Sequence, residues 1–359
     1  MLNGLRIIEI EGIGPGPFAG MTLADLGAEV IVVQRKGGGG ATGGGRPPLT
    51  RGKRTIALDL KDAEDVAVLK KLITTADGLI EGFRPGVMER LGLGPEECQA
   101  LRPQLVYGRM TGWGQDGPMS HMAGHDMNYT SISGALWYAS LPGEVPQAPP
   151  TIVGDIGGGA LYLVIGLLAG IMEARQTGKG RVVDAAIVDG SAHMMNLLLS
   201  LGATGNLSME RGQSRLDGPP YSRAYRCADG GFMTVQCLEP KFYAEFRQRM
   251  GIEGEALFDD QSDKAAWPNQ SARLAEIFAS QPRDHWAALF EGSDSCAAPI
   301  LSPEEAAAHP HMKARGVYAP SEGGLQALAA PRFSGYDATP RQVPAYDQHG
   351  DEIRAELGV

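Results

Sequence analysis

Strand-like and helix-like segments alternate regularly over the first 110 residues, and this alternation limits most strongly how the chain can fold. Short β-branched runs at 5–10 and 28–34 are separated by the helical stretch FAGMTLADLG. Further strand patterns follow at 55–60, 78–83 and 105–110. Because strands that alternate with helices form sheets covered by those helices, the sequence predicts an α/β domain with a mainly parallel sheet.

The second half of the chain has a different pattern. A helical segment at 186–205 leads into the polar stretch NLSMERGQSRLDGPPYS, which is typical of a linker. Beyond it, YRCADGGFMTVQCL predicts two strands joined by an ADGG turn, followed by the helical patterns KFYAEFRQRM and SARLAEIFAS. We therefore expect a smaller α+β domain from about 224 to 312.

Length and charge restrict the classes of partner. A chain of 359 residues is too long for most single cores, which favours two domains. The net charge of -10 repels nucleic acid and anionic membranes, so neither is an expected partner. The apolar stretch from Ala160 to Ala174 is shorter than the ~20 residues of a membrane span and is followed by the turn QTGKG, so we expect a buried core helix.

Cysteine use and the chain ends favour a cytoplasmic location. The cysteines form no CxxC pair, which predicts neither a zinc site nor a disulfide framework; they are Cys98, Cys227, Cys237 and Cys296. MLNGLRIIEIEG lacks the basic start and long apolar run of a signal peptide, and the final LGV is no peroxisomal signal.

The glycine-rich segment GIGPGPFAG (12–20) satisfies a G-x-G-x-x-A pattern between a strand and a helix, which suggests a dinucleotide site. Pro15 and Pro17, however, remove backbone donors, and the next strand ends in Gln34 and Arg35 instead of an acidic ribose ligand. A tight strand-to-helix turn is the better interpretation, and a NADP-dependent reductase is disfavoured.

The segment RKGGGGATGGGRPPLTRGKR (35–54) is strongly basic. It contains no acid and six basic residues, namely Arg35, Lys36, Arg46, Arg51, Lys53 and Arg54. In an acidic chain this cluster indicates a phosphate-bearing ligand, although a mobile solvated loop explains the glycines equally well. Arg84 and Arg90 add further positive charge nearby in sequence, and the absence of a GxxxxGK[ST] motif argues against ATP hydrolysis.

The segment AGHDMNY contains His125 beside Asp126, and His121 lies four residues before His125. Two histidines four apart on a helix form a metal-binding face, but the HExxH glutamate is missing and Gly124 is a poor helix former, so we expect no metal. The chain also lacks the G-x-S-x-G elbow of serine hydrolases.

Two carboxylates lie at predicted helix starts. Asp155, in VGDIGGGALYL, is interpreted either as a helix N-cap worth about 1 kcal/mol or as part of a glycine-rich backbone close to a ligand. Glu239, in QCLEPKFY, precedes Pro240 at a strand-to-helix junction and taken alone is another cap.

From end to end the chain resembles the class III CoA-transferase superfamily, and within it the α-methylacyl-CoA racemase branch. The resemblance rests on these stretches in order: LRIIEIEGIGPGPFAGMTLADLGAEVI, DGLIEGFRPGVMERLGLGPEE, YGRMTGWGQDGP, AGHDMNY, VGDIGGGA, GKGRVVDAAIVDG, LEPKFY and APRFS. It implies a large Rossmann-like α/β domain (1–185 with 330–359), a small α+β domain (224–312) and linkers (186–223 and 313–329). It further implies an interlocked homodimer whose active sites are shared between chains.

The resemblance also implies the reaction and its residues. The family activity is epimerisation of (2R)- and (2S)-2-methylacyl-CoA thioesters through an enolate, with His125 and Asp155 as acid/base groups. Glu239 of the other chain would orient His125. No metal or nucleotide redox cofactor is implied, because CoA arrives as part of the substrate. The positions that would bind CoA are Arg35, Arg84, Arg90, Ile13, Ala57 and Asp126, the last by its backbone N–H as a candidate enolate donor.

A CoA-transferase is the alternative within the same superfamily. In that reaction the residue at Asp155 would be a nucleophile that forms an acyl anhydride, and His125 would have no role. The presence of both the histidine and Glu239 favours the racemase.

Overall fold

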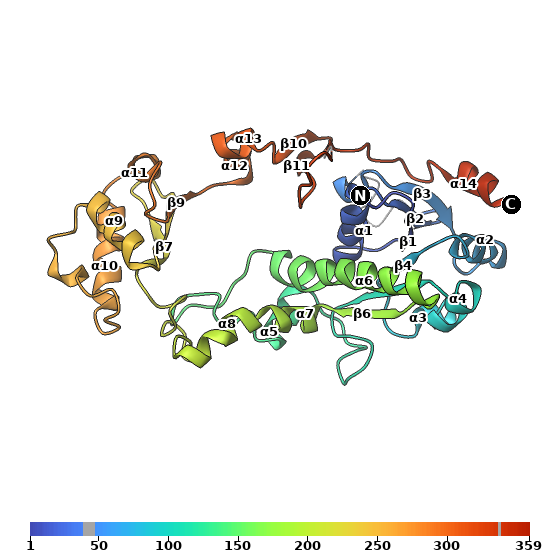
Figure 1. Ribbon diagram of the computed structural model, residues 1–359, viewed down its shortest axis with the longest axis horizontal. Helices are drawn as coiled ribbons and strands as arrows, with labels where there is room; N and C mark the ends of the chain where they lie inside the picture. Colours follow the sequence, from blue (N-terminus) through green and yellow to red (C-terminus); the bar gives the residue numbers. More distant parts are fainter. Residues whose placement is uncertain (39–46, 337–338) are drawn as a thin grey trace. The chain divides into compact units, whose positions relative to one another are not determined.

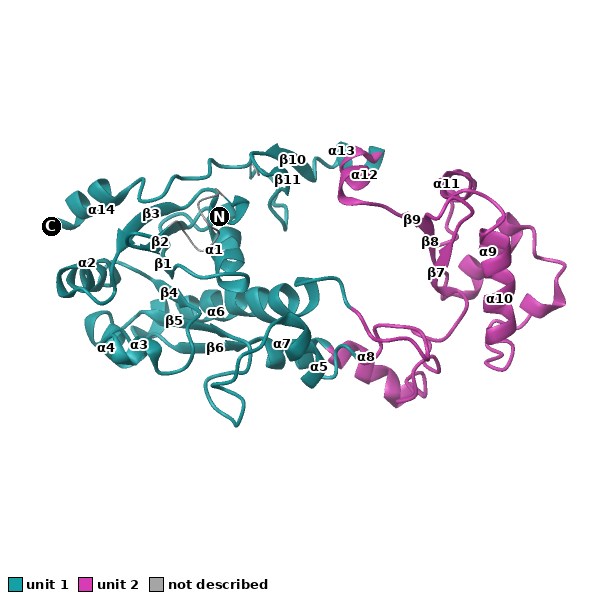
Figure 2. Ribbon diagram, turned by 180° about the vertical axis from the view of Figure 1, so that it is seen from behind, with its two compact units in different colours: residues 1–136, 148–194, 310–359 teal, residues 137–147, 195–309 magenta. Residues whose placement is uncertain are grey.

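The computed structural model describes residues 1–38, 47–336 and 339–359, which divide into two compact units (Figure 2). Unit 1 consists of Met1–Leu136, Ala148–Met194 and Pro310–Val359. Unit 2 consists of Trp137–Gln147 and Met195–His309.

A six-stranded parallel sheet forms the centre of unit 1, which confirms the predicted α/β fold (Figure 1). Its strands are β1 (Arg6–Ile10), β2 (Glu29–Arg35), β3 (Arg54–Leu58), β4 (Gly78–Glu81), β5 (Val106–Thr111) and β6 (Val182–Ala186). The spatial order is β3-β2-β1-β4-β5-β6. Strands β2 and β3 therefore extend the sheet on one side of β1, and β4, β5 and β6 extend it on the other side.

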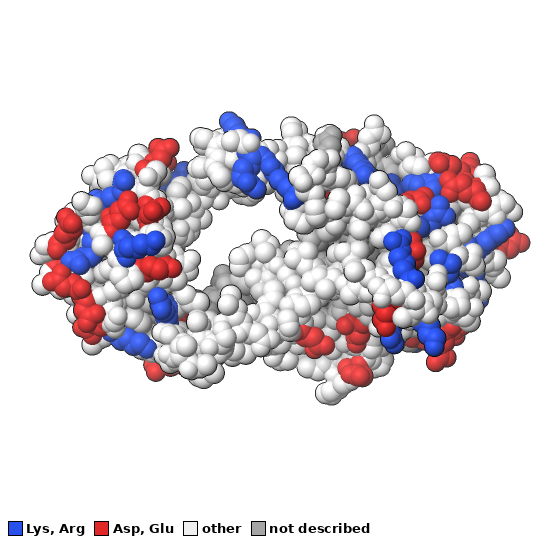
Figure 3. Space-filling view, in the orientation of Figure 1, with Lys and Arg blue, Asp and Glu red and all other residues white. Residues whose placement is uncertain are grey.

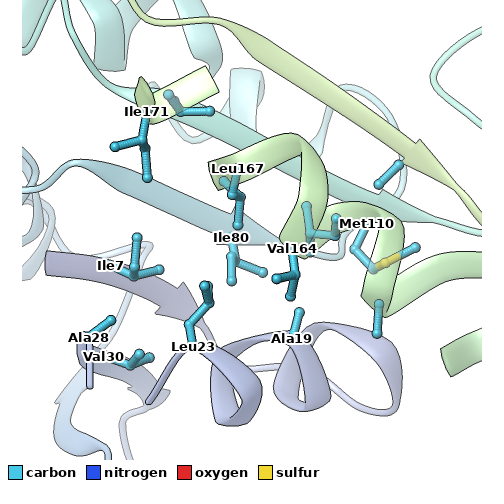
Figure 4. Close-up of a cluster of buried hydrophobic side chains, with 14 of the residues drawn as sticks. Ile7, Ala19, Leu23, Ala28, Val30, Ile80, Met110, Val164, Leu167 and Ile171 are labelled. Carbon is cyan, nitrogen blue, oxygen red and sulfur yellow. The ribbon is translucent and has the colours of Figure 1, made fainter. Parts of the chain in front are cut away.

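Helices cover both faces of this sheet. One face carries α1 (Pro15–Asp25) and α6 (Leu161–Thr177), whose apolar side chains interdigitate with those of β1 and β4 (Figure 4). The other face carries α2 (Ala63–Ile73), α4 (Pro95–Leu101) and α14 (Gly350–Leu357). Neighbouring residues of one strand consequently enter different cores: Ile7 faces the first cluster and Ile8 the second, and both are fully buried.

Residues from both ends of the chain build unit 1. Ile353 and Leu357 of α14 pack in the second cluster with the buried side chains of α2, and both ribbon views place α14 beside β3 and α2. The other short elements of unit 1 are η1 (Pro48–Thr50), α3 (Val87–Arg90), α5 (Asp126–Ile132), η2 (Ile152–Ala160), α7 (Ile187–Met194), α13 (Pro310–Ala314), β10 (Tyr318–Ser321) and β11 (Gly324–Ala327).

The apolar helix is longer than the sequence predicted. The π-helix η2 continues directly into α6, so that Ile152–Thr177 forms 26 helical residues with a mean hydropathy of 1.9 in its most apolar window. By length and composition alone this segment is long and apolar enough to cross a membrane, but core helices of soluble proteins also meet these two criteria. One side packs in the core as expected, through Leu163, Leu167 and Ile171, whereas the opposite side is exposed.

Unit 2 has its own core. It contains the antiparallel sheet β7 (Ser222–Arg226), β8 (Phe232–Gln236) and β9 (Ala297–Ile300), covered by α9 (Pro240–Met250), α10 (Trp267–Phe278) and α11 (Arg283–Phe290). The predicted hairpin turn is present between β7 and β8, where Cys227 N–H donates to the Gly231 carbonyl at 2.8 Å. The remaining elements are α8 (Asn196–Ser200), η3 (Leu201–Thr204), η4 (Ala256–Phe258) and α12 (Pro303–Ala308).

The borders of the units differ from the expected domain limits at 185, 224, 312 and 330. Helix α7 belongs to unit 1 because Gly158 and Gly190 let η2 and α7 approach each other without side chains between them. Residues 137–147 belong instead to unit 2, where Trp137 Nε1 donates to the Met209 carbonyl at 2.9 Å. Residues 313–329, expected as linker, are part of unit 1, as are residues 310–312, expected in the small domain.

Candidate active site

A cleft of about 520 Å³ opens at the carboxyl ends of β1, β4 and β5. Its walls are the β1–α1 loop, the segments that follow β4 and β5, residues 120–129 before and in α5, and Asp155 of η2. Parallel sheets bind ligands at this edge, at the point where the order of the strands reverses. In this sheet the reversal occurs between β1 and β4, beneath the cleft.

The β1–α1 loop is the tight strand-to-helix turn that the sequence predicted. Gly14 has a φ of 68°, which glycine adopts without strain, and the helix begins directly at Pro15. The Pro17 carbonyl accepts a hydrogen bond at 2.9 Å from Lys53 Nζ, which lies 2.6 Å from the Glu9 carboxylate. This ion pair is buried, and the hydrogen bond from Lys53 to Pro17 attaches the first turn of α1 to it.

A second buried carboxylate holds the loop after β4. Glu81 accepts a hydrogen bond from the Phe83 N–H at 2.7 Å and another from Arg109 Nε at 3.2 Å. Arg109 also bonds to Glu89 on α3 at 2.5 Å. Burial raises the pKa of Glu81 despite these bonds. These bonds fix the backbone of the loop that contains Arg84, and Arg84 lines the cleft.

His125 is exposed on the wall of the cleft, directly before α5. Its backbone N–H donates to Asn128 Oδ1 at 3.0 Å. The Tyr129 hydroxyl donates to the carbonyl of Gly124, and the Tyr129 ring packs edge-on against Trp113, with ring centroids 4.7 Å apart. The backbone on both sides of His125 is therefore anchored. His121 precedes α5, so the helical histidine face considered for a metal does not form.

Asp155 lies within the π-helix η2, a rare element that is frequent at functional sites. Thr151, immediately before η2, has a φ of 62°, which is unusual for a β-branched residue. Among the described residues, the half-buried Asp155 carboxylate has no hydrogen-bond donor. Burial and, next, the charge of Asp126 raise its pKa to about 6, while His125 opposes the shift.

Both sequence interpretations of the Asp155 region need correction. Asp155 is not an N-cap, because it lies inside the helix and its carboxylate caps no N–H. The glycine run serves packing against α7: a Cβ at Gly157 would lie 3.1 Å from Met194, and one at Gly159 would lie 2.9 Å from Ile187. Glycine is required at these positions by a neighbouring helix that follows about 30 residues later in the sequence.

Asp126 is the neighbour of His125 whose role the sequence left open. It is the first residue of α5 and is 7% exposed. Its Oδ1 accepts a hydrogen bond from the backbone N–H of Asp155 at 2.8 Å. The sequence pointed to Asp126 because it follows His125 directly, but its contact with Asp155 could be recognised only in the folded structure.

The predicted CoA-binding residues have different positions. Ile13 and Arg84 line the cleft together with His125 and Asp155. The other residues do not line it. Arg35 ends β2, where its backbone N–H donates to Glu11 Oε2 at 3.0 Å; Ala57 is buried in β3; and Arg90 ends α3.

The basic segment 35–54 is largely structural. Arg51 and Lys53 are each 3% exposed and pair with Asp25 and Glu9, so the expectation of a phosphate-binding cluster is wrong for these two. Lys36 and Arg54 also form ion pairs, with Asp65 and with Glu29, Glu352 and Glu356. Within the described ranges Arg35 forms no ion pair. Arg46 and the glycine-rich stretch around it lie outside the described residues.

Glu239 belongs to unit 2, where it is exposed immediately before α9. The predicted helix start at Pro240 is confirmed, but the Glu239 side chain makes no capping hydrogen bond. Leu238 and Pro240, on either side of it, line a cavity of about 210 Å³ within unit 2. The described parts of both units contain no group of three or more His, Cys, Asp or Glu side chains suited to a metal ion.

Three comparisons relate this geometry to known proteins. The family model described as CoA-transferase family III matches residues 2–350. An alpha-methylacyl-CoA racemase from Mus musculus is 39% identical over 362 residues, covering 100% of this chain and 93% of that protein. The Homo sapiens protein of the same name is 38% identical over 361 residues, covering 99% and 93%. The crystal structure of a CAIB/BAIF family protein from Brucella suis superposes with a TM-score of 0.83 at 28% identity and covers 99% of both chains.

Proposed function

Because the chain belongs to CoA-transferase family III, we propose from its cleft and its relatives that it epimerises 2-methylacyl-CoA thioesters at C2. The observation that carries this proposal is the pairing, in one cleft, of the His125 imidazole with an Asp155 carboxyl whose pKa is about 6. At pH 7 such a carboxyl is ionised in most molecules and protonated in about a tenth of them. Both states needed by an acid/base group are therefore populated.

The reaction needs two proton transfers at one carbon. One group of the pair removes the proton from C2 on one face, which leaves an enolate conjugated with the thioester carbonyl. The other group, protonated, returns a proton to the opposite face. His125 is the base for one epimer and Asp155 for the other. Because the pair supplies both transfers, the proposed reaction requires neither a metal nor a redox cofactor, and CoA enters as part of the substrate.

The enolate oxygen requires a hydrogen-bond donor close to the pair. The first N–H groups of a helix have no intrahelical acceptor, and Asp126 is the first residue of α5, directly after His125. We assign the Asp126 backbone N–H to this role.

The CoA part of the substrate is assigned to the side of the cleft that contains Arg84. Arg84 is exposed, lines the cleft and forms no ion pair within the described part of the chain, so its charge is available for a phosphate. Ile13 supplies an exposed apolar surface on the opposite loop. Arg35, Arg90 and Ala57, which lie outside the cleft wall, are assigned to the nucleotide end of CoA.

A homodimer is part of the proposal. Leu161, Ile165 and Met172 are 42%, 61% and 66% exposed, and their spacing places them on one side of α6. Figure 3 shows few charged side chains over this helix. A second copy of the chain would cover this apolar stripe and bring its Glu239 to His125.

We further propose a cytoplasmic location, which the four free cysteines favour.

The test is incubation with a (2R)-2-methylacyl-CoA in D2O. We expect deuterium to enter at C2 while the 2S epimer accumulates, as measured by mass spectrometry and chiral chromatography. A CoA-transferase that uses Asp155 as its nucleophile would move CoA to an added free acid without exchange at C2. Transfer without exchange would refute the proposal.

A further inference from the structure

A hydrogen bond links Asp155, which lines the cleft, to the buried carboxylate of Asp126, which lies behind the cleft wall. The Asp126 carboxylate accepts the backbone N–H of Asp155 across 29 residues of sequence, with an Oδ1–N distance of 2.8 Å. Gly154, the residue before Asp155, has no Cβ, and an added one would lie only 2.5 Å from Asp126 Oδ1. The glycine therefore permits this contact, and the contact fixes the backbone that carries the Asp155 side chain.

The second oxygen of Asp126 is the more informative one. Oδ2 is buried and has no hydrogen-bond partner among the described residues. A buried polar atom without a partner costs on the order of 1–3 kcal/mol, so native proteins retain few of them. Without a donor on Oδ2, the negative charge of Asp126 is only partly balanced and acts on its surroundings. Asp155 is the carboxyl group on which it acts.

We infer that Asp126 is a positioning residue for proton transfer by Asp155, acting through its hydrogen bond to the Asp155 backbone and through its charge. This inference rests on the proposed function. It assigns the Asp126 side chain a role separate from that of its N–H group. It also explains why a carboxylate occupies this site, although burial of an apolar residue there would cost less free energy.

The effect of this charge has a definite direction. Burial is the larger cause of the raised pKa of Asp155, and the nearby negative charge of Asp126 adds to it because it disfavours ionisation of the carboxyl. His125 has the opposite effect on Asp155, and Tyr129 also faces it. Other titratable groups on the elements that pack against η2 are Asp25 of α1, Tyr107 and Arg109 of β5, Tyr162, Glu173 and Arg175 of α6, Asp184 of β6, and Asp189 and His193 of α7. None of these contributes to the Asp155 shift.

The deciding variant is Asp126→Asn, which keeps an oxygen acceptor for the Asp155 N–H and removes the charge. For the epimer from which Asp155 removes the proton, we expect the acid limb of the kcat/KM profile to move to lower pH by roughly 1 unit. Asp126→Ala removes the acceptor as well, so we expect a larger loss of kcat. Asp189→Asn on α7 is the matched control: the same exchange on a neighbouring helix should leave the acid limb in place.

A second readout does not depend on turnover. With ¹³C-labelled aspartate, the Asp155 carboxyl can be titrated by NMR in wild type and in Asp126→Asn, and we expect its midpoint to fall in the variant. An unchanged midpoint or acid limb would overturn the inference, as would unfolding of both Asp126 variants while Asp189→Asn folds. If the wild type shows neither exchange nor epimerisation, the proposed function fails, and the NMR titration still decides the role of Asp126.

Discussion

Asp65 and Asp155 are both carboxylates of unit 1, but their surroundings differ. Asp65 of α2 is buried and accepts hydrogen bonds from Asp59 N–H, Lys36 Nζ and Arg354 Nη2 at 2.9, 3.0 and 3.3 Å. Burial alone would raise its pKa, but these donors outweigh burial and lower it. Within the described part of the chain no donor contacts the Asp155 carboxylate, and its pKa is raised by burial and by the charge of Asp126. Perturbed pKa values cluster at functional sites, so the difference between the two carboxylates supports the acid/base role proposed for Asp155.

The largest expected effect is on the chemistry of Asp155. Asp155→Asn should lower epimerisation by about 10³-fold, because one of the two proton-transfer groups is lost. Since the Asp155 carboxylate accepts no hydrogen bond from the described residues, the thermal unfolding midpoint should not fall. Chiral analysis of the products and a melting curve measure the two quantities. A variant with full activity would remove Asp155 from the mechanism.

His125 tests the same pair from the other side. His125→Ala should slow deuterium exchange at C2 by about 10²-fold from the epimer that needs the imidazole as base. Exchange from the other epimer should persist, because Asp155 still removes that proton. Exchange from each pure epimer in D2O gives the ratio. Equal losses from both epimers would count against one base on each face.

Asp65 should show the opposite behaviour to Asp155. Asp65→Asn leaves Lys36 and Arg354 without their partner and should lower the free energy of unfolding by about 2 kcal/mol. The pH profile of epimerisation should stay where it is in wild type. Urea unfolding and initial rates provide the measurements, with Asp189→Asn as control. A shifted rate profile would show that the two carboxylates are not separate in function.

The smallest expected effect is the pH dependence of stability. The folded-state pKa of Asp155 is raised, so its ionisation lowers stability progressively from about pH 4 to pH 6. Asp155→Asn should therefore be more stable than wild type above pH 6 by about 1 kcal/mol, a figure reduced for partial solvent exposure. For Asp65 the sign is reversed: its lowered pKa contributes stability that is lost as pH falls below about 4. Melting curves at about pH 3, 4.5 and 7.5 compare the variants, and the lowest pH tests Asp65.

Local sequence patterns predicted the architecture well. Strand-like runs and helical stretches predicted β1 to β5 and the hairpin of unit 2, because period and turn chemistry are local properties. The resemblance supplied the residues of the cleft, and His125, Asp155, Ile13 and Arg84 do line one cavity.

Electrostatic partners were much harder to predict. Arg51 and Lys53 look like a ligand-binding cluster in sequence, because the acids that neutralise them, Asp25 and Glu9, come from earlier elements. The glycines of η2 suggested a nearby ligand because α7, the helix that packs against them, is distant in the sequence. The contact between Asp126 and Asp155 likewise depends on tertiary structure.

The position of α14 has a consequence for the order in which the protein is made. Ile353 and Leu357 complete the apolar layer between the sheet and α2, yet they leave the ribosome after every other residue of that layer. The whole of unit 2 is synthesised earlier, since it ends at His309. Unit 2 can thus reach its final fold while unit 1 still exposes part of its second core, and fusions or truncations at the carboxyl end act on the folding of unit 1.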